Sequence, residues 1–317
     1  MVPHARRLCT TLSKHLVAGH LAVSEQVATC LGNLSTHPAF RKEMVDGSKA
    51  LLALLQVLPS VPPGEGESIL LPNALAALHN CSLLPDAIGF ITTEETALAL
   101  LPRLAGPPAL ARRAAAVLAK CATRQPKVID ALVGHPSALP GLIKAIVSEG
   151  AAHDAADDAP RVVDITEAGA AEASAAADAA GGTLSEEEEE MVGSAVRILT
   201  ACASRAEAAA AVCEHGGLPA LVKLLGRADD GLRGNAALCI AECAKEARCL
   251  AVLAVQSVVP PLLDIAHNGK GQAQKNAAIA LGRLAKNPRC LQAIRDNHGI
   301  EILARAMKGS FGNMGLG

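Results

Sequence analysis

The fold of this chain is decided by two similar stretches, NAALCIAECAKEARCL at Asn235–Leu250 and NAAIALGRLAKNPRCL at Asn276–Leu291. The second follows the first at an offset of 41, and eight of their sixteen positions are identical. The same offset pairs Pro219 with Pro260. A fixed offset of this size is the signature of a repeat architecture, in which each unit buries its apolar faces against its neighbours.

Weaker copies of the end of this stretch lie upstream. They read TCLGNLS at Thr29, AALHNCS at Ala76, AVLAKCA at Ala116 and RILTACA at Arg197. One position, which we call the anchor, is occupied in the six copies by Asn33, Asn80, Lys120, Ala201, Glu242 and Arg283. The successive anchor spacings are 47, 40, 81, 41 and 41, and the value of 81 is one period plus an insertion.

Within each period, apolar residues three and four apart predict a short helix, a second helix and a longer third helix. In the fifth repeat we expect these at 205–215, 218–225 and 231–244, with glycine-containing breaks between them. The chain has three Phe and no Trp or Tyr, so its core must be aliphatic, which suits closely packed helices. The sequence therefore predicts an all-α, right-handed α-solenoid of about six repeats.

Three helices in one such period, with GGLPALVKLL (Gly216–Leu225) as the second helix and an NAAxAL pattern in the third, resemble the armadillo repeat. The motif is clear in the last two full copies and degenerate in the first three, so HEAT-like packing is the structural alternative. The resemblance implies a stack of repeats with one long concave surface.

The chain divides by composition. We expect armadillo repeats at 1–148 with a partial first repeat, an acidic low-complexity insertion at 149–187, further repeats and a C-terminal helix at 188–308, and a flexible tail at 309–317. The stretch 149–190 holds 13 acidic residues and one basic residue, Arg161, so it carries −12 while the rest carries about +10.

Such a composition is typical of a solvated, disordered loop. The alternative is that this segment covers basic groove residues and competes with a partner. Ser185 directly precedes the glutamate run Glu186–Glu190, a pattern that suits an acid-directed kinase, and its phosphorylation would deepen the negative charge.

In armadillo proteins the third helices line the groove, and an asparagine near the end of that helix pairs with the backbone of a bound peptide. Asn33 and Asn80 match it, whereas the other anchors depart from it and the family's tryptophan column is absent. Seven residues before each anchor, on the same helical face, every side chain is polar: Gln26, Asn73, Arg113, Ser194, Asn235 and Asn276. We expect this column to face the groove; the alternative is that these side chains cap or brace the helix starts.

The candidate protein-binding residues share a place on these two columns or, for Arg197, on the tryptophan column. They are Gln26, Asn33, Asn73, Asn80, Arg113, Lys120, Arg197, Asn235, Glu242, Asn276 and Arg283. Because four of them are Arg or Lys, the groove suits an acidic, carboxylate-rich segment. A solvated face of mixed charge is the alternative.

Other functional classes find little support. Cys81, Cys121, Cys202 and Cys243 share a slot with Leu34 and Leu284, which indicates core positions, and no Cys or His spacing suggests a metal or cofactor site. No nucleophile motif or phosphate loop indicates an enzyme. Three aromatic residues and a net charge of −2 argue against nucleic-acid binding. We find no signal peptide or membrane span, and we expect reduced cysteines in an intracellular protein.

The run NAAIALGRLAKNPRCLQAIRDNHGIEIL from Asn276 resembles the armadillo end of the tetratricopeptide repeat protein 12 family. That family joins N-terminal tetratricopeptide repeats to C-terminal armadillo repeats, so we expect this chain to be the C-terminal part of a longer protein. The resemblance implies a cytoplasmic, co-chaperone-like factor for assembly of axonemal dynein arms, with dynein subunits and Hsp70/Hsp90 machinery as partners. The alternative is a general armadillo adaptor in transport, adhesion or ubiquitin pathways.

Overall fold

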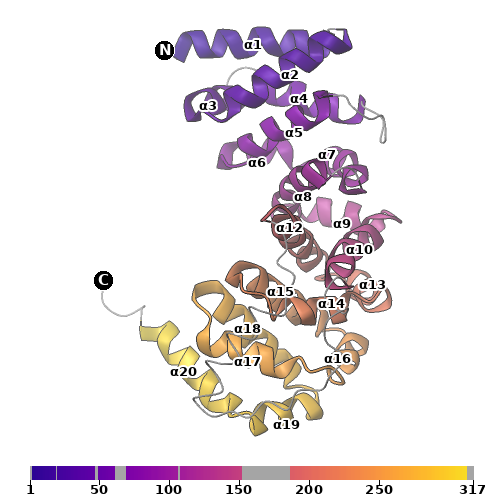
Figure 1. Cartoon of the computed structure of the whole chain (residues 1–317), viewed down its shortest axis with the longest axis vertical. Coiled ribbons are helices and arrows are strands. Elements are labelled where there is room, and N and C mark those ends of the chain that lie inside the picture. Colours follow the sequence, from indigo (N-terminus) through magenta and orange to yellow (C-terminus); the bar gives the residue numbers. More distant parts are fainter. Residues whose placement is uncertain are drawn as a thin grey trace. The chain divides into compact units, whose positions relative to one another are not determined.

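The computed structural model describes residues 2–18, 20–46, 49–60, 69–105, 108–151 and 186–312. All regular structure in these ranges is helical, without a β-strand. The chain divides into two compact units, residues 1–141 and 142–317, which we describe separately (Figure 1). The predicted all-α class is confirmed.

Unit 1 repeats the predicted order of first, second and third helices. Its third helices are α2 (Leu21–Ser35), α5 (Leu70–Cys81) and α8 (Pro108–Ala122). The first helices are α3 (Pro38–Asp46), α6 (Pro85–Ile91) and α9 (Pro126–Gly134), and the second helices are α4 (Ala50–Val57) and α7 (Glu94–Leu100). The remaining elements are α1 (Val2–Ala18), which takes a second-helix place, and the 3₁₀ turns η1 (Leu58–Ser60) and η2 (Leu101–Ala105).

Unit 2 follows the same order after α10 (Ala138–Ala151), a second helix that crosses the division at residue 141. Its third helices are α12 (Glu186–Cys202), α15 (Asp230–Cys243) and α18 (Gly271–Leu284). The first helices are α13 (Ala206–Glu214), α16 (Ala247–Leu253) and α19 (Pro288–Asp296), and the second helices are α14 (Gly217–Leu224), α17 (Val259–Asn268) and α20 (Gly299–Gly312). The three helices predicted in the fifth repeat are therefore confirmed to within a residue or two.

Two of the predicted boundaries differ from the structure. The glutamate run Glu186–Glu190, which the composition placed in the insertion, forms the start of α12. Acidic side chains at a helix N-terminus are stabilised by the helix dipole, so the charge run and the helix are compatible. α20 continues to Gly312, past the predicted end at 308. Residues 152–185, with Ser185, and 313–317 lie outside the described residues.

The core is aliphatic, as the composition predicts. Leu and Ile fill it, and Cys81, Cys121, Cys202 and Cys243 are fully buried together with Leu284. The predicted core slot is therefore confirmed at these five positions, whereas Leu34, the sixth, is half-exposed. All ten cysteines are free thiols. Burial raises the pKa of the Cys121 thiol to about 12, so this side chain is neutral and acts as an apolar filler.

Successive third helices pack side by side within each unit: α2 on α5 and α5 on α8, and α12 on α15 and α15 on α18 (Figure 1). Small residues permit the closest approach, since a Cβ placed on Gly234 would lie 2.8 Å from the Ala273 Cα on α18. Some corners between first and second helices use a left-handed residue. Gly216 supplies it with φ +75°, and His298, two periods later, adopts φ 53° at the same place.

Candidate protein-binding surface

Three anchor side chains, Asn80, Lys120 and Arg283, each tie a third helix to the one before it. Asn80 Nδ2 donates to Ser35 Oγ at 2.8 Å, and Lys120 Nζ donates to Ser82 Oγ at 2.8 Å. In unit 2 the same place holds an ion pair, in which Arg283 Nη1 lies 2.9 Å from Glu242 Oε1. Most of the anchors predicted to face a groove therefore lie between helices, half-buried.

The column seven residues before the anchor makes a second set of ties. Asn276 Nδ2 donates to the Gly234 carbonyl at 2.8 Å, and Arg113 Nη1 donates to the Pro72 carbonyl at 3.1 Å, in the same register of the repeat. Asn73 Nδ2 donates to Thr29 Oγ1 at 3.0 Å. The bracing alternative describes these three side chains, because each joins two neighbouring third helices.

Two members of this column require a correction. We expected this column to face the groove, but Asn276 is 3% exposed and Ser194 is fully buried. Both are satisfied locally, since the Asn276 amide also accepts from Gln272 Nε2 and the Ser194 hydroxyl accepts from Arg197 Nη2. Asn276 therefore stabilises the stack and is not available at the surface.

Four predicted residues keep polar groups available. Gln26 and Asn33 are exposed and Asn235 is half-buried, and none of the three makes a side-chain hydrogen bond within the described ranges. Arg197 makes a single one there, to Ser194 Oγ at 3.0 Å, while its buried Nε has no partner. A guanidinium in this state retains donors for a ligand.

The surface of the third helices is formed by a different row of positions, eleven and four residues before the anchor and three after it. The first two positions are seven residues apart and so lie on one stripe of the helix, and the third lies just past the end of the helix. We call these positions the exposed row. In unit 1 it comprises Ala22, Thr29, Thr36, Ile69, Ala76, Leu83, Ala109, Ala116 and Thr123. In unit 2 it comprises Glu190, Arg197, Ser204, Gly231, Leu238, Lys245, Gln272, Ile279 and Lys286.

All members of the exposed row are exposed or half-exposed except Ala116. The two units differ in its chemistry. The row of unit 1 has no charged residue, and Ile69 and Leu83 are its largest side chains. The row of unit 2 contains Arg197, Lys245 and Lys286 with one acid, Glu190, so it carries net positive charge. Only the unit 2 row therefore offers cations to an acidic segment.

Glu242 lies beside this row and pairs with two cationic side chains, Lys245 and Arg283. Burial by itself would raise the pKa of this carboxyl group, but hydrogen bonds from Lys245 and Arg283 outweigh it, and the net result is a lowered pKa. The Lys245 Nζ lies 2.5 Å from Glu242 Oε2. Glu242 is therefore ionised at neutral pH and holds two of the nearby cations in place.

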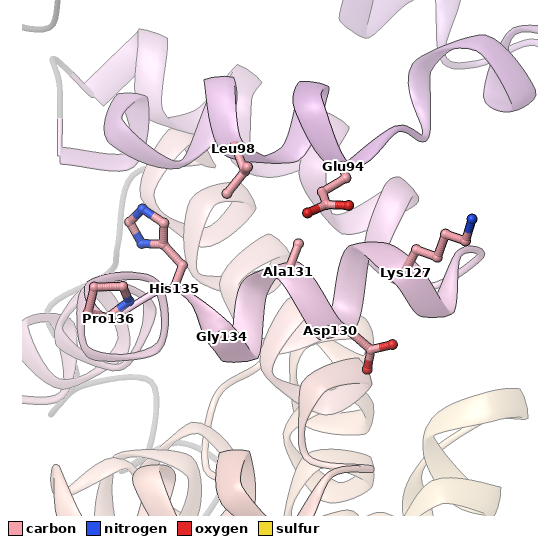
Figure 2. A pocket seen from close by; sticks show the side chains of 8 residues that line it. All are labelled: Glu94, Leu98, Lys127, Asp130, Ala131, Gly134, His135 and Pro136. Atoms are coloured by element: carbon pink, nitrogen blue, oxygen red, sulfur yellow. The ribbon is translucent and has the colours of Figure 1, made fainter.

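A shallow hollow of about 480 Å³ lies elsewhere in unit 1, between α7 and α9. Figure 2 shows Glu94 and Leu98 directed from α7 toward α9, and Lys127 and Asp130 of α9 also line the hollow. His135 at the end of α9 has its Nδ1 within 3.2 Å of Ser137 Oγ. The hollow lies on first and second helices, and the residues that line it include no Ser, Thr or Cys.

The described residues hold no group of three or more His, Cys, Asp or Glu side chains suited to a metal ion. Among the helices that the structure describes, none is long and apolar enough to cross a membrane.

Comparison with known proteins identifies the fold. The chain is similar to a designed armadillo repeat protein at 20% identity, with a TM-score of 0.57 over 87% of this chain and 99% of that one. A second designed armadillo repeat protein, in complex with the peptide (KR)4, gives 19% identity and a TM-score of 0.56 over 87% and 98%. A structure from work on the interaction between cadherin and β-catenin gives 16% identity and a TM-score of 0.66, over 97% of this chain and 54% of that chain.

No protein-family model matches the chain, and no curated protein matches it. The structural neighbours define an armadillo-type, three-helix repeat fold, which the sequence pattern also indicates. The sequence analysis recognised the exposed row at Arg197 only, because it followed the anchor column and the column seven residues before it. The sequence contained one indication of this row. Three residues after the anchor, five of the six copies have Thr, Ser or Lys, and the sixth has Leu83.

Proposed function

We propose that this chain is a non-catalytic scaffold that binds an acidic, extended segment of a partner protein along the exposed row of unit 2. The observation that carries the proposal is the register of α12, α15 and α18, which places Arg197, Leu238 and Ile279 at equivalent positions on neighbouring helices. Apolar side chains flanked by cations suit a segment in which carboxylates accompany apolar residues.

Three residues contribute polar groups to this surface. Asn235 lies one turn from Leu238 and has its amide available, as an extended backbone requires. Arg197 makes a single side-chain hydrogen bond within the described ranges, to Ser194, and Lys286 is exposed just after the end of α18. The predicted cations Arg113, Lys120 and Arg283 have a bracing role in this proposal, because their hydrogen bonds join neighbouring helices.

The test uses two labelled peptides of equal length: the (KR)4 peptide of the designed neighbour and a charge-inverted peptide of four Asp-Glu pairs. We expect the acidic peptide to bind more tightly, and Arg197→Glu to weaken it about tenfold at low salt. The matched control is Arg248→Glu, a charge reversal at an exposed position on α16. Equal binding of the two peptides, or equal effects of the two variants, would contradict the proposal.

Within this function we propose a narrower role, in which the chain is a cytoplasmic, co-chaperone-like factor for assembly of axonemal dynein arms. The support is the resemblance of the run from Asn276 to the tetratricopeptide repeat protein 12 family, which covers α18, α19 and the first residues of α20. Its partners are then dynein subunits and Hsp70/Hsp90 machinery. A general armadillo adaptor that binds an extended peptide is the other candidate, because the neighbours include a peptide complex.

Interaction mass spectrometry in ciliated cells separates the two roles. The intact protein and its Arg197→Glu variant are compared, so that partners of the exposed row are those lost in the variant. Recovery of dynein chains and Hsp70/Hsp90 components supports the narrower role. Recovery of import, junction or ubiquitin-pathway proteins in their place supports the general adaptor.

A further inference from the structure

Two cysteines of unit 2 lie against each other at the contact between two first helices. Cys213 is on α13 and Cys249 is on α16, and these helices pack on one another (Figure 1). The two thiols form a side-chain hydrogen bond. The Cys249 Sγ also lies 3.2 Å from the carbonyl oxygen of Ala209, which is one turn before Cys213 on α13. The Cys249 side chain is therefore directed at the turn of α13 that carries Cys213.

An ion pair beside the thiols joins the same two turns. Arg248 Nη1 lies 2.5 Å from Glu214 Oε1. Arg248 directly precedes Cys249 in the chain, and Glu214 directly follows Cys213. Both charged side chains are exposed, so the thiol pair lies just inside the protein surface. A disulfide requires two side chains that face each other at close range, and the neighbouring ion pair holds the two turns in that arrangement.

The repeat positions of the two thiols show that packing does not require either of them. One period after Cys249 the chain again has a cysteine, Cys290, which is buried. One period after Cys213, however, the residue is Ala254, so Cys290 has an alanine at the position of the partner thiol. One period before Cys249 the residue is Ala208, which is fully buried. Alanine therefore fits both positions in other repeats, and the pair of thiols belongs to this one interface.

The two thiols differ in their access to a solute. Cys213 is half-exposed, whereas Cys249 is fully buried, and burial is the main cause that raises the pKa of Cys249 to about 12. Cys249 is thus a neutral thiol that a solute does not reach directly. Cys239 and Cys243 on α15 are also hydrogen-bonded to each other, but both are fully buried. Of these two thiol pairs, only the first has a member that an oxidant can meet.

We propose that Cys213 and Cys249 are a reversible oxidation site, at which a hydroperoxide converts the two thiols into a disulfide that links α13 to α16. With hydrogen peroxide, the Cys213 sulfur attacks one oxygen and the O–O bond breaks. Cys213 becomes a sulfenic acid, and the other oxygen leaves as water with the thiol proton. The Cys249 sulfur then attacks the Cys213 sulfur and displaces its hydroxyl group, which takes the Cys249 proton and leaves as a second water.

The disulfide ties the first helices of two neighbouring repeats. Because each repeat of a solenoid contacts only its neighbours, a covalent link across one interface limits how far these two repeats can separate. The link also closes a loop between residues 213 and 249, which restricts the unfolded chain. Oxidation should therefore stabilise unit 2, and a small thiol reductant should reverse the effect. The site is independent of the exposed row, which belongs to the third helices.

The test treats the intact protein with hydrogen peroxide, blocks the remaining thiols with iodoacetamide under denaturing conditions and digests the protein with trypsin. Cleavage after Lys and Arg separates the two thiols, with Cys213 in peptide 206–223 and Cys249 in peptide 249–270. We expect mass spectrometry to find these peptides joined, with the loss of two hydrogen atoms, and dithiothreitol to separate them. The urea midpoint of the oxidised protein should rise by about 0.5–1 M and return on reduction.

Two variants remove one thiol each. Cys213→Ser should abolish both the link and the rise of the midpoint, and it should fold because the side chain is half-exposed. Cys249→Ala should have the same effect, and alanine is the residue found one period earlier at Ala208. Circular dichroism verifies that both variants fold like the original protein.

Two other cysteines supply the controls. Cys30 is an exposed thiol on α2 of unit 1, so the peroxide reaches it, but Cys30→Ser should leave the link and the rise of the midpoint unchanged. Cys290 has the repeat position of Cys249 without the partner thiol, so it should be recovered with its iodoacetamide label.

Three outcomes overturn the proposal. The first is that peptides 206–223 and 249–270 stay separate at a peroxide concentration that fully modifies Cys30. The second is a link of Cys249 to Cys243 in place of Cys213. The third is a midpoint that oxidation raises equally in the original protein and in Cys213→Ser.

Discussion

The two units share one fold and differ in what joins their repeats. In unit 1 the anchor side chains that join third helices donate to hydroxyl groups, as in the Asn80 to Ser35 and Lys120 to Ser82 hydrogen bonds. In unit 2 the anchors form the Glu242–Arg283 ion pair, and Gly234 is in close contact with Ala273. The aliphatic core slots are the same in both. The apolar core pattern therefore specifies this fold, whereas the polar groups that join neighbouring helices can differ from one repeat to the next.

The units also differ in sequence regularity. The anchor spacings of unit 2 are 41 and 41, and those of unit 1 are 47 and 40. The longer spacing arises between η1, which ends at Ser60, and α5, which begins at Leu70. Added length in a connection costs little free energy, so it does not disturb the packing of α2 on α5.

The largest effect is expected from filling the close contact of unit 2. Gly234→Val should lower the free energy of unfolding by about 2–3 kcal/mol, because the added atoms overlap α18 and force the helices apart. Gly282→Val is the control, since a Cβ at Gly282 meets nothing within 4 Å, and its effect should stay within about 0.5 kcal/mol. Urea unfolding measures both. Similar losses in the two variants would show that the contact does not hold the repeats together.

The second-largest effect on stability is expected from the asparagines seven residues before the anchors, which occur in both units. Asn276→Ala should cost about 1–2 kcal/mol, because it removes a buried hydrogen bond to the Gly234 carbonyl. Asn73→Ala in unit 1 should cost about 0.5–1 kcal/mol, since Asn73 is only half-buried. Asn235→Ala should change stability by less than about 0.5 kcal/mol. The same urea experiment ranks the three variants, and a different order would contradict the bracing role of Asn276 and Asn73.

A smaller effect concerns pH. The lowered pKa of Glu242 means that its contribution is present above the unfolded-state pKa of about 4.3 and is lost as the pH falls through the lower folded-state value. Glu242→Gln should therefore cost about 0.5–1 kcal/mol at pH 6 and less at pH 3. Asn80→Ala in unit 1 removes a tie without a titratable group, so its cost should be the same at both pH values. Urea unfolding of both variants at pH 6 and pH 3 measures these free energies of unfolding.

The smallest effect on stability is expected at the exposed row. Lys286→Ser in unit 2 and Leu83→Ser in unit 1 should each change the free energy of unfolding by less than about 0.5 kcal/mol. Their effects on binding should differ, with Lys286→Ser weakening the acidic peptide about two- to fivefold and Leu83→Ser leaving it unchanged. Fluorescence anisotropy measures this. A loss of affinity in the Leu83 variant would move the binding surface to unit 1.

The repeat period and the helix order were predictable because they depend on local chemistry. Apolar spacing, glycine breaks and proline at Pro219 and Pro260 specify each helix without reference to the rest of the chain. The burial of Cys81, Cys121, Cys202 and Cys243 could likewise be predicted, because leucine occupies the same repeat position in the other copies. The glutamate run was harder to place, since its charge favours a solvated coil while its position at a helix start favours α12.

The candidate site was only partly predictable. Sequence spacing placed Asn235 and Asn276 on one face of their helices, but the structure buries Asn276 and leaves the Asn235 amide available. The two residues are identical in type and in repeat position. They differ in what the neighbouring helix brings to them, and Asn276 receives the Gly234 carbonyl of α15.

The sequence by itself determined an aliphatic three-helix repeat, its period, and the six third helices, because each follows from the periodicity of the chain. Only the tertiary structure decided which polar positions join neighbouring helices and which reach the surface. The reason is that a side chain's exposure depends on how closely the adjacent helix approaches, and that distance is set by residues one repeat period away, such as Gly234 beneath Ala273.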